Sequence, residues 1–173
     1  AHLICDEIAV GFGRTGTFFA HEQAGIRPDL LCLSKGITGG YLPLSVVLSS
    51  DTIYQAFWDD DVRRGFLHSH SYTGNPLACR AALATLDIFD TDDTLEQNRH
   101  LSSAITKALQ PLATHSAVRH FRNTGMIWAM DVDTSQADFS RRYFAAAMER
   151  GILVRPIGKT IYLMPPYVLS ELD

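Results

Sequence analysis

Short apolar runs separated by polar or glycine-containing breaks make up the first 91 residues of the chain. Three of these runs have the length of buried strands, and they cover residues 3–5, 30–33 and 44–48. Continuous apolar runs of this length are typical of strands that are covered on both faces of a sheet. Helices are predicted at residues 18–24 before Gly25, from the N-cap Asp51 to about Trp58, and at residues 76–90 after the N-cap Asn75. The order of these elements indicates an α/β fold.

The pattern changes after residue 91, where longer amphipathic segments begin. Apolar residues recur at helical spacing in a segment that Asp93 caps and that extends to about Thr114. Beyond it, the pattern predicts strands at residues 126–131, 152–154 and 160–164, and a helix at residues 136–150. We therefore expect two domains, residues 1–91 and the α+β unit 116–173, with residues 92–115 as the connecting helix. Because the chain starts inside a predicted strand and residues 169–173 look like the start of a helix, we expect a segment of a longer protein.

The composition is that of an ordinary globular protein. Apolar residues make up 46% and charged residues 20% of the 173 residues, which excludes disorder as the main state. The net charge of −4 argues against general nucleic-acid binding, which needs a basic surface. The longest apolar runs are far shorter than the ~20 residues that span a bilayer, so no membrane protein is expected. Cys5, Cys32 and Cys79 lie in apolar stretches, and we expect buried free thiols in a reducing cytoplasm.

Two short motifs give weak signals for binding sites. Gly11, Gly13 and Gly16 match the spacing of the dinucleotide-binding fingerprint and follow a predicted strand. The helical segment that follows is too short for that fingerprint, so a nicotinamide site is disfavoured. His68 and His70 could present two imidazoles on one strand face, but no third ligand is close in the sequence. The chain also contains no CxxC pair, and we expect no metal site.

Ionisable residues follow two of the predicted strands at the point where each strand ends. Asp6-Glu7 follows the first strand, and Lys35, one of three lysines, follows the second. In a parallel sheet these strand ends share one edge, which is where α/β proteins bind ligands. Each residue, taken alone, could also be an ordinary surface residue. Together, a carboxylate and a lysine that attacks a carbonyl are what pyridoxal phosphate needs, because the carboxylate pairs with its protonated ring nitrogen.

Several longer stretches contain this pair of residues and resemble class III aminotransferases, which are pyridoxal-phosphate enzymes of fold type I. These stretches are DEIAVGFGRTG at residues 6–16, Pro28-Asp29, and SKGITGG at residues 34–40 with Pro43. Two more stretches resemble the biotin-pathway branch of the family: SYTGNPLAC at residues 71–79, and Arg155-Pro156 followed by IYLMPPY at residues 161–167. The resemblance implies that residues 1–91 are the C-terminal part of the large, mostly parallel-sheet domain. It also implies that residues 116–173 are an incomplete small C-terminal domain.

The resemblance implies a role for five residues. Lys35 would bind the cofactor pyridoxal 5'-phosphate covalently and carry a proton between the two carbons of the 1,3-shift. Asp6 would pair with the ring nitrogen, and Ile8 would pack on one face of the ring. Ser71 would contact the cofactor phosphate of a neighbouring subunit, because the family forms homodimers with active sites at the interface. Arg155 would bind the carboxylate of the keto acid substrate through its planar fork of two donors.

The biotin-pathway branch implies one reaction and leaves alternatives open. In that branch, 8-amino-7-oxononanoate becomes 7,8-diaminononanoate, with S-adenosylmethionine as the usual amino donor and lysine in some relatives. Another class III aminotransferase, acting on ornithine, 4-aminobutyrate or a diamine, is the first alternative. A non-catalytic fragment of such an enzyme is the second. The sequence departs from residues common in the family at Val10, and at His70-Ser71, where Ser71 keeps a hydroxyl group for phosphate contact.

Overall fold

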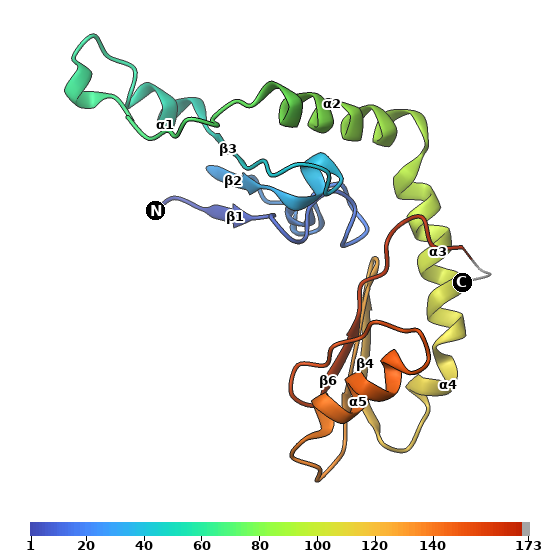
Figure 1. Ribbon diagram of the computed structural model, residues 1–173. Helices are drawn as coiled ribbons and strands as arrows, with labels where there is room; N and C mark the ends of the chain where they lie inside the picture. The colour runs from blue at the N-terminus through green and yellow to red at the C-terminus, as the bar shows by residue number, and fades with distance from the viewer. Residues whose placement is uncertain (171–173) are drawn as a thin grey trace. The chain divides into compact units, whose positions relative to one another are not determined.

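The computed structural model describes residues 1–170, and Figure 1 shows the course of the chain. The chain divides into two compact units, Ala1–Leu95 and Glu96–Asp173. The division falls within residues 92–115, the predicted connecting helix, and the assignment of the units to a large and a small domain stays a prediction. Of the helix start predicted at residues 169–173, the last three residues lie outside the described part of the chain. The mixture of strands and helices confirms the expected α/β class.

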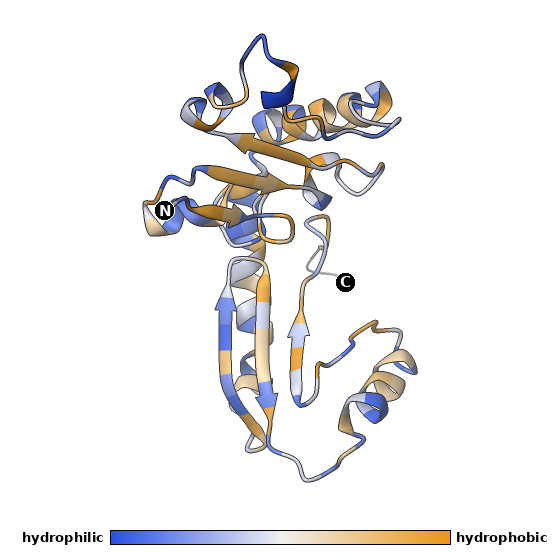
Figure 2. Cartoon of the chain, turned by 90° about the vertical axis from the view of Figure 1, so that its left-hand side faces the viewer, coloured by the Kyte–Doolittle hydropathy of each residue, from blue (hydrophilic) through white to orange (hydrophobic). Residues whose placement is uncertain are grey.

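A three-stranded sheet of order β1-β2-β3 forms the frame of the first unit. Strands β1 (Ile4–Asp6) and β2 (Leu30–Leu33) are parallel, and β3 (Val46–Ser49) runs antiparallel to β2. Figure 2 shows hydrophobic residues along all three strands. The apolar runs therefore predicted these strands to within one or two residues, and they predicted the parallel pair.

Five helices of 3 to 16 residues lie wholly within the first unit. They are η1 (Ala20–Ala24), η2 (Lys35–Thr38), α1 (Asp51–Gln55), η3 (Val62–Arg64) and α2 (Pro76–Thr91). Helix α2 begins as predicted, because the Asn75 side chain accepts hydrogen bonds from the backbone N–H groups of Leu77 and Ala78. The prediction for α1 was wrong in its cap and its length. Ser50 has the extended backbone of an N-cap, Asp51 already lies in the first turn, and the helix ends at Gln55 rather than near Trp58.

The core of the first unit centres on Phe12, whose side chain is 4% exposed. Its ring meets the rings of Phe18 and Phe19 edge-on, with centroids 5.5 and 5.7 Å apart. The same ring lies across the backbone of Gly36. A Cβ atom added at Gly36 would come within 2.9 Å of the Phe12 side chain, which is closer than real Cβ contacts. The segment after β1 and the turn after β2 therefore fit together only because residue 36 is glycine.

Gly36→Ala is expected to lower the free energy of unfolding by about 1–3 kcal/mol, because the added methyl group overpacks the core against Phe12. Gly65→Ala is the matched control. Gly65 also has an ordinary backbone conformation, but an added Cβ would meet the exposed Leu67 side chain and a backbone oxygen at 3.3 Å. The control is expected to change stability by less than about 1 kcal/mol. Urea unfolding measures both variants, and equal midpoints for the two would contradict the close packing at Gly36.

An antiparallel sheet of order β4-β5-β6 forms the frame of the second unit. Its elements are α3 (Thr94–Ala108), α4 (Gln110–Ala113), β4 (Val118–Thr124), β5 (Ile127–Val132), α5 (Phe139–Met148) and β6 (Thr160–Leu163). The fully buried residues Met126, Trp128 and Met130 form its centre. The indole N–H of Trp128 donates to Thr106 Oγ1 at 2.9 Å, which joins the sheet to α3.

Three predictions for the second unit were wrong. The helix predicted to extend to Thr114 breaks after Ala108, because Pro111 lacks an N–H donor and can sit only in the first turn of a new helix. Strand β4 was not predicted, because it is mostly polar and carries an irregularity between Arg119 and Arg122 that interrupts alternation. Residues 152–154 form no strand in the described part of the chain, and Pro156 lacks the donor that strand pairing needs.

Candidate active site

Asp6 and Lys35 lie at the same edge of the sheet in the first unit. Strands β1 and β2 are parallel, and their register pairs Asp6 with Cys32. Lys35 follows the end of β2 by two residues and begins the turn η2. Both side chains are exposed. This edge, beyond the carboxyl ends of parallel strands, is where the topology of an α/β fold places ligands.

The carboxylate of Asp6 is oriented by its own backbone. Its Oδ1 accepts a hydrogen bond from the N–H of Ile8 at 3.0 Å, which closes a short turn immediately after β1. Ile8 is half-buried beside it. At this edge, the oriented carboxylate of Asp6 therefore lies two residues from the apolar side chain of Ile8.

Lys35 is held in a backbone conformation that lysine rarely adopts. Its φ angle is 43°, in the left-handed region, where a non-glycine residue costs about 1–3 kcal/mol. Two neighbouring hydroxyl groups fix this turn, because Ser34 donates to the carbonyl of Leu44 at 2.7 Å and Thr38 donates to the carbonyl of Leu42 at 2.6 Å. Strain of this kind is concentrated at active sites and ligand-binding positions in proteins.

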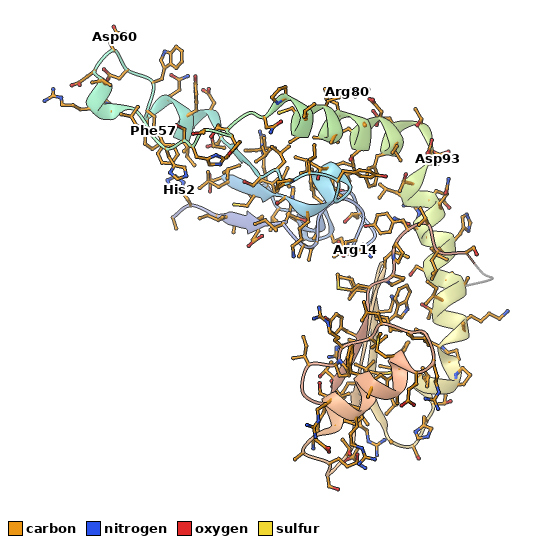
Figure 3. All side chains as sticks on the ribbon, in the orientation of Figure 1. His2, Arg14, Phe57, Asp60, Arg80 and Asp93 are labelled. Carbon is orange, nitrogen blue, oxygen red and sulfur yellow. The ribbon has the colours of Figure 1, made fainter. Side chains whose placement is uncertain are left out.

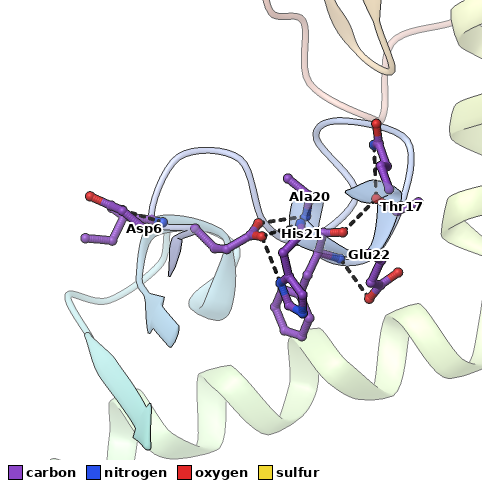
Figure 4. A network of polar contacts seen from close by, with 9 residues as sticks. Asp6, Thr17, Ala20, His21 and Glu22 are labelled. Carbon is purple, nitrogen blue, oxygen red and sulfur yellow. Dashed lines mark hydrogen bonds and ion pairs between the residues drawn. The ribbon is translucent and has the colours of Figure 1, made fainter. Parts of the chain in front are cut away.

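Glu7 lies on the opposite side of the chain from Asp6. Its side chain is buried, and its carboxylate accepts hydrogen bonds from the N–H groups of Ala20 and His21, each at 2.8 Å. The Nδ1 atom of His21 contacts the same carboxylate at 3.0 Å (Figure 4). Asp6-Glu7 is therefore not a surface acidic pair. The sequence reasoning missed this inward role of Glu7, although the alternation of side chains along a strand gave a signal for it.

The glycine-containing loop after β1 closes on itself. The N–H of Gly11 donates to the carbonyl of Glu7 at 2.9 Å, and Gln23 donates to the carbonyl of Thr15 at 2.7 Å. Gly13 and Gly16 adopt φ angles of 85° and 100°. The helix that follows, η1, has only five residues, whereas a dinucleotide site needs a full helix at this point.

Ser71 and Arg155 lie elsewhere in the chain. Ser71 is exposed in a turn that the hydrogen bond from the Thr73 N–H to the His70 carbonyl closes at 2.9 Å. Arg155 belongs to the second unit, where it is exposed and lines a pocket of about 450 Å³. The other residues that line this pocket are Ala137, Asp138, Ser140, Arg141, Phe144 and Pro156. Within the first unit, the structure thus gathers Asp6, Ile8 and Lys35 at one edge.

In the second unit, the pKa of the Asp131 carboxyl group is strongly lowered. Hydrogen bonds from Thr160, His120 and Arg122, in that order of effect, lower the pKa of Asp131 to about 2. These contacts join β4, β5 and β6 through one side chain. Because the pKa is lowered, the ionised form stabilises the fold above about pH 4, and this contribution is lost as the pH falls toward 2.

The prediction for the three cysteines was correct in one part and wrong in another. The three cysteines are free, but Cys5 and Cys32 are half-buried and Cys79 is exposed, so the expectation that all are buried was wrong. Cys79 lies on the solvent side of α2, because the face of that helix that packs inward is formed by Ala78 and Ala82. Within residues 1–170, no group of three or more His, Cys, Asp or Glu side chains could hold a metal ion. No helix in that range has both the length and the apolar character that crossing a membrane requires.

Comparisons with known proteins agree on one family. The family model of class-III aminotransferases matches residues 1–173. Adenosylmethionine-8-amino-7-oxononanoate aminotransferase of Helicobacter pylori is 49% identical, over 98% of this chain and 40% of the relative. The enzyme of the same name from Synechococcus elongatus is 44% identical, over 99% of this chain and 41% of the relative. The chain thus spans about two fifths of the length of the curated relatives it matches.

Solved structures give the same result for the fold. A crystal structure of adenosylmethionine-8-amino-7-oxononanoate aminotransferase from Methanocaldococcus jannaschii superposes with a TM-score of 0.90 at 36% identity, over 98% of this chain and 42% of that one. An omega transaminase from Pseudomonas jessenii, in complex with PMP, has a TM-score of 0.90 at 27% identity, over 99% of this chain and 40% of that one. The two units are therefore folded as in known transaminases.

Proposed function

This chain belongs to the class-III aminotransferases, and on that premise we propose that it forms part of a pyridoxal-phosphate enzyme of biotin synthesis. The proposed reaction transfers an amino group to 8-amino-7-oxononanoate and gives 7,8-diaminononanoate, with S-adenosylmethionine as the amino donor. The observation that carries the proposal is the placement of Asp6 and Lys35 at one sheet edge. The names of the relatives at 49% and 44% identity support the choice of substrate. The free cysteines fit the reducing cytoplasm in which we place the enzyme.

The residues at this edge fit pyridoxal phosphate by their chemistry. The amine of Lys35 is exposed, the carboxylate of Asp6 is exposed and fixed in direction by the Ile8 N–H, and Ile8 offers an apolar surface. Pyridoxal phosphate, when bound, supplies an electron sink that stabilises negative charge on a substrate carbon. No other lysine is comparable, because Lys107 lies in α3 and Lys159 lies next to β6, both in the second unit.

Each residue of the edge has a distinct task in this proposal. Lys35 Nζ would hold the cofactor covalently at rest. Once the amino donor has released it, the amine would take the α-proton of the donor and deliver it to the other carbon of the 1,3-shift. The Asp6 carboxylate would hold the ring nitrogen in its protonated form, because a carboxylate stabilises a neighbouring positive charge. Ile8 would cover one face of the ring and exclude water from it. The turn at Lys35 is already fixed by hydrogen bonds. The backbone therefore loses little conformational entropy when the amine takes its reactive position.

A second copy of the chain is the proposed partner. The part of the first unit between α1 and α2, in which Figure 3 labels Phe57 and Asp60, carries large apolar side chains that face solvent. Trp58, Phe66, Leu67 and Tyr72 are each 69–82% exposed. Monomeric proteins rarely leave such a set uncovered. Ser71 lies in the same segment, which supports its proposed contact with the cofactor phosphate of the partner subunit.

Competition between amino acceptors tests the proposed substrate. Because the chain spans two fifths of its relatives, activity is measured both for the chain and for a chimera in which the chain replaces the matching residues of the Helicobacter pylori relative. A preference for 8-amino-7-oxononanoate over 2-oxoglutarate is expected. A preference for 2-oxoglutarate would contradict the assignment to biotin synthesis and would favour a different class III aminotransferase.

Arg155→Ala is expected to raise the Michaelis constant for 8-amino-7-oxononanoate by about 10–100-fold, because each hydrogen bond to a charged group contributes about 1.5–3 kcal/mol. The turnover number should change little, since Arg155 binds the substrate away from the reacting atoms. Arg141→Ala is the control, because Arg141 lines the same pocket but is paired with Asp138 at 3.7 Å. Steady-state kinetics of the chimera measure both variants. A large fall in turnover number with an unchanged Michaelis constant would refute the role of Arg155.

A further inference from the structure

We propose that Glu7 is a positioning residue for the active site, and that its buried carboxylate fixes the backbone that carries Asp6 and Ile8. The proposal rests on the proposed function, because it assigns to Glu7 the task of aiming the carboxylate that pairs with the cofactor ring nitrogen. Glu7 itself touches neither the cofactor nor the substrate in this account.

The contacts of the Glu7 side chain bring a distant segment to the end of β1. Its Oε2 atom accepts from the N–H of Ala20 and its Oε1 atom accepts from the N–H of His21, each at 2.8 Å. An ionised carboxylate only accepts hydrogen bonds, so His21 Nδ1, 3.0 Å from Oε1, is the donor in the third contact. Both oxygens are thus occupied in a place where the residue is 2% exposed. Figure 4 shows this convergence on the first turn of η1.

The backbone of Glu7 is also held on both sides. Its N–H donates to the carbonyl of Cys32 at 2.9 Å, and its carbonyl accepts from the N–H of Gly11 at 2.9 Å. An added Cβ at Gly11 would lie 2.9 Å from that carbonyl oxygen, so the approach of the loop leaves no free space. Residue 7 is therefore tied to β2, to the loop that follows it and to η1.

Immobilising residue 7 also fixes its two neighbours. Asp6 is the last residue of β1 and is exposed, and the half-buried Ile8 begins the turn that follows, so both are bonded directly to the buried residue 7. The Asp6 carboxylate accepts a hydrogen bond from the N–H of Ile8, across residue 7. A rotation of the backbone at residue 7 would therefore turn the Asp6 carboxylate away from its direction.

Glu7→Gln tests this inference with the least change in shape. The amide keeps one acceptor, but its NH2 group must face either the Ala20 N–H or the His21 N–H, so one buried donor loses its partner. Glu22→Gln is the matched control. Glu22 lies in η1, the helix that contains Ala20 and His21, and its carboxylate accepts a hydrogen bond from the Phe19 N–H at 3.2 Å. Glu22 is exposed, and glutamine would keep an oxygen that accepts this single hydrogen bond.

Hydrogen exchange of the Ile8 amide, followed by NMR in the cofactor-free chain, reads the orientation of Asp6 directly. In Glu7→Gln, protection of Ile8 is expected to fall at least about tenfold while the amides of β2 keep theirs. In Glu22→Gln, both should remain as in the parent chain. Unchanged protection of Ile8 in Glu7→Gln would overturn the proposal.

The ring nitrogen of ¹⁵N-labelled pyridoxal phosphate provides the second measurement. We expect its ¹⁵N chemical shift to report a protonated nitrogen in the parent and in Glu22→Gln. In Glu7→Gln, the chemical shift is expected to move toward the value measured in Asp6→Asn. A parent without a protonated ring nitrogen would contradict the proposed function, whereas the exchange comparison would still decide the role of Glu7. If the ¹⁵N chemical shift of the ring nitrogen in Glu7→Gln is identical to that in the parent, the proposal is overturned.

His21→Phe keeps the test decisive if Glu7→Gln fails to fold. The ring of His21 stacks on Phe19 with centroids 5.7 Å apart, and phenylalanine preserves that stacking. The variant removes only the Nδ1 contact and leaves both backbone hydrogen bonds to Glu7. A smaller fall in Ile8 protection than in Glu7→Gln, but a measurable one, is expected, and no fall at all in a folded His21→Phe would count against the proposal.

Discussion

Lys35→Ala is expected to abolish amino transfer, with a rate at least ~10⁴-fold below that of the parent, because the substitution removes both covalent attachment and the group that moves the proton. Substrate binding should be affected far less, since Arg155 lies in another unit of the chain. The rate of 7,8-diaminononanoate formation by the chimera measures the effect.

Two controls show whether the loss is specific to this lysine. Lys107→Ala and Lys159→Ala remove the two other lysines, which are also exposed. Both should retain the activity of the parent. Added methylamine should also restore part of the activity of Lys35→Ala, because a small free amine can replace the proton transfer. Activity above one tenth of the parent level in Lys35→Ala, without an added amine, would refute the assignment.

Asp6→Asn is expected to slow amino transfer by about 10²–10⁴-fold and to leave the fold intact. Asparagine keeps an oxygen that accepts from the Ile8 N–H, so the turn after β1 survives. The negative charge is lost, and with it the stabilisation of the proton on the ring nitrogen. The effect should therefore appear in the proton-abstraction step rather than in covalent attachment to Lys35.

The kinetic isotope effect on the rate of amino transfer, measured with an amino donor deuterated at its α-carbon, distinguishes proton abstraction from covalent attachment. In Asp6→Asn the effect should increase, because proton abstraction becomes rate-limiting. Asp51→Asn is the control, since Asp51 is an exposed aspartate in the first turn of α1 and its loss should leave the rate unchanged. Near-normal rates in Asp6→Asn would refute its role.

The part of the site that is built on regular strands could be predicted from the sequence. Continuous apolar runs marked β1 and β2, and the polar residues after them placed Asp6 and Lys35 at one edge. This worked because the ends of parallel strands share an edge whatever their detailed packing. The cap at Asn75 was predictable for a similar reason, since its hydrogen bonds join residues two and three positions apart.

Features that depend on contacts between distant residues could not be predicted. The identity of the partner of Glu7, His21, fourteen residues away, has no local signal, and the close packing of Gly36 depends on Phe12. Strand β4 is defined by pairing with β5 rather than by its own mostly polar sequence. The left-handed conformation of Lys35 has no signal in its residue type, because lysine does not favour it.

Covalent trapping of the cofactor tests the central claim most directly. The chain is incubated with pyridoxal phosphate, reduced with borohydride and digested, and the modified peptide is located by mass spectrometry. A phosphopyridoxyl group on Lys35 is predicted, with none on that peptide in Lys35→Ala and with a reduced yield when the chain is first unfolded in urea. Equal labelling of Lys35, Lys107 and Lys159, or labelling that unfolding leaves unchanged, would contradict a formed site at the edge of β1 and β2.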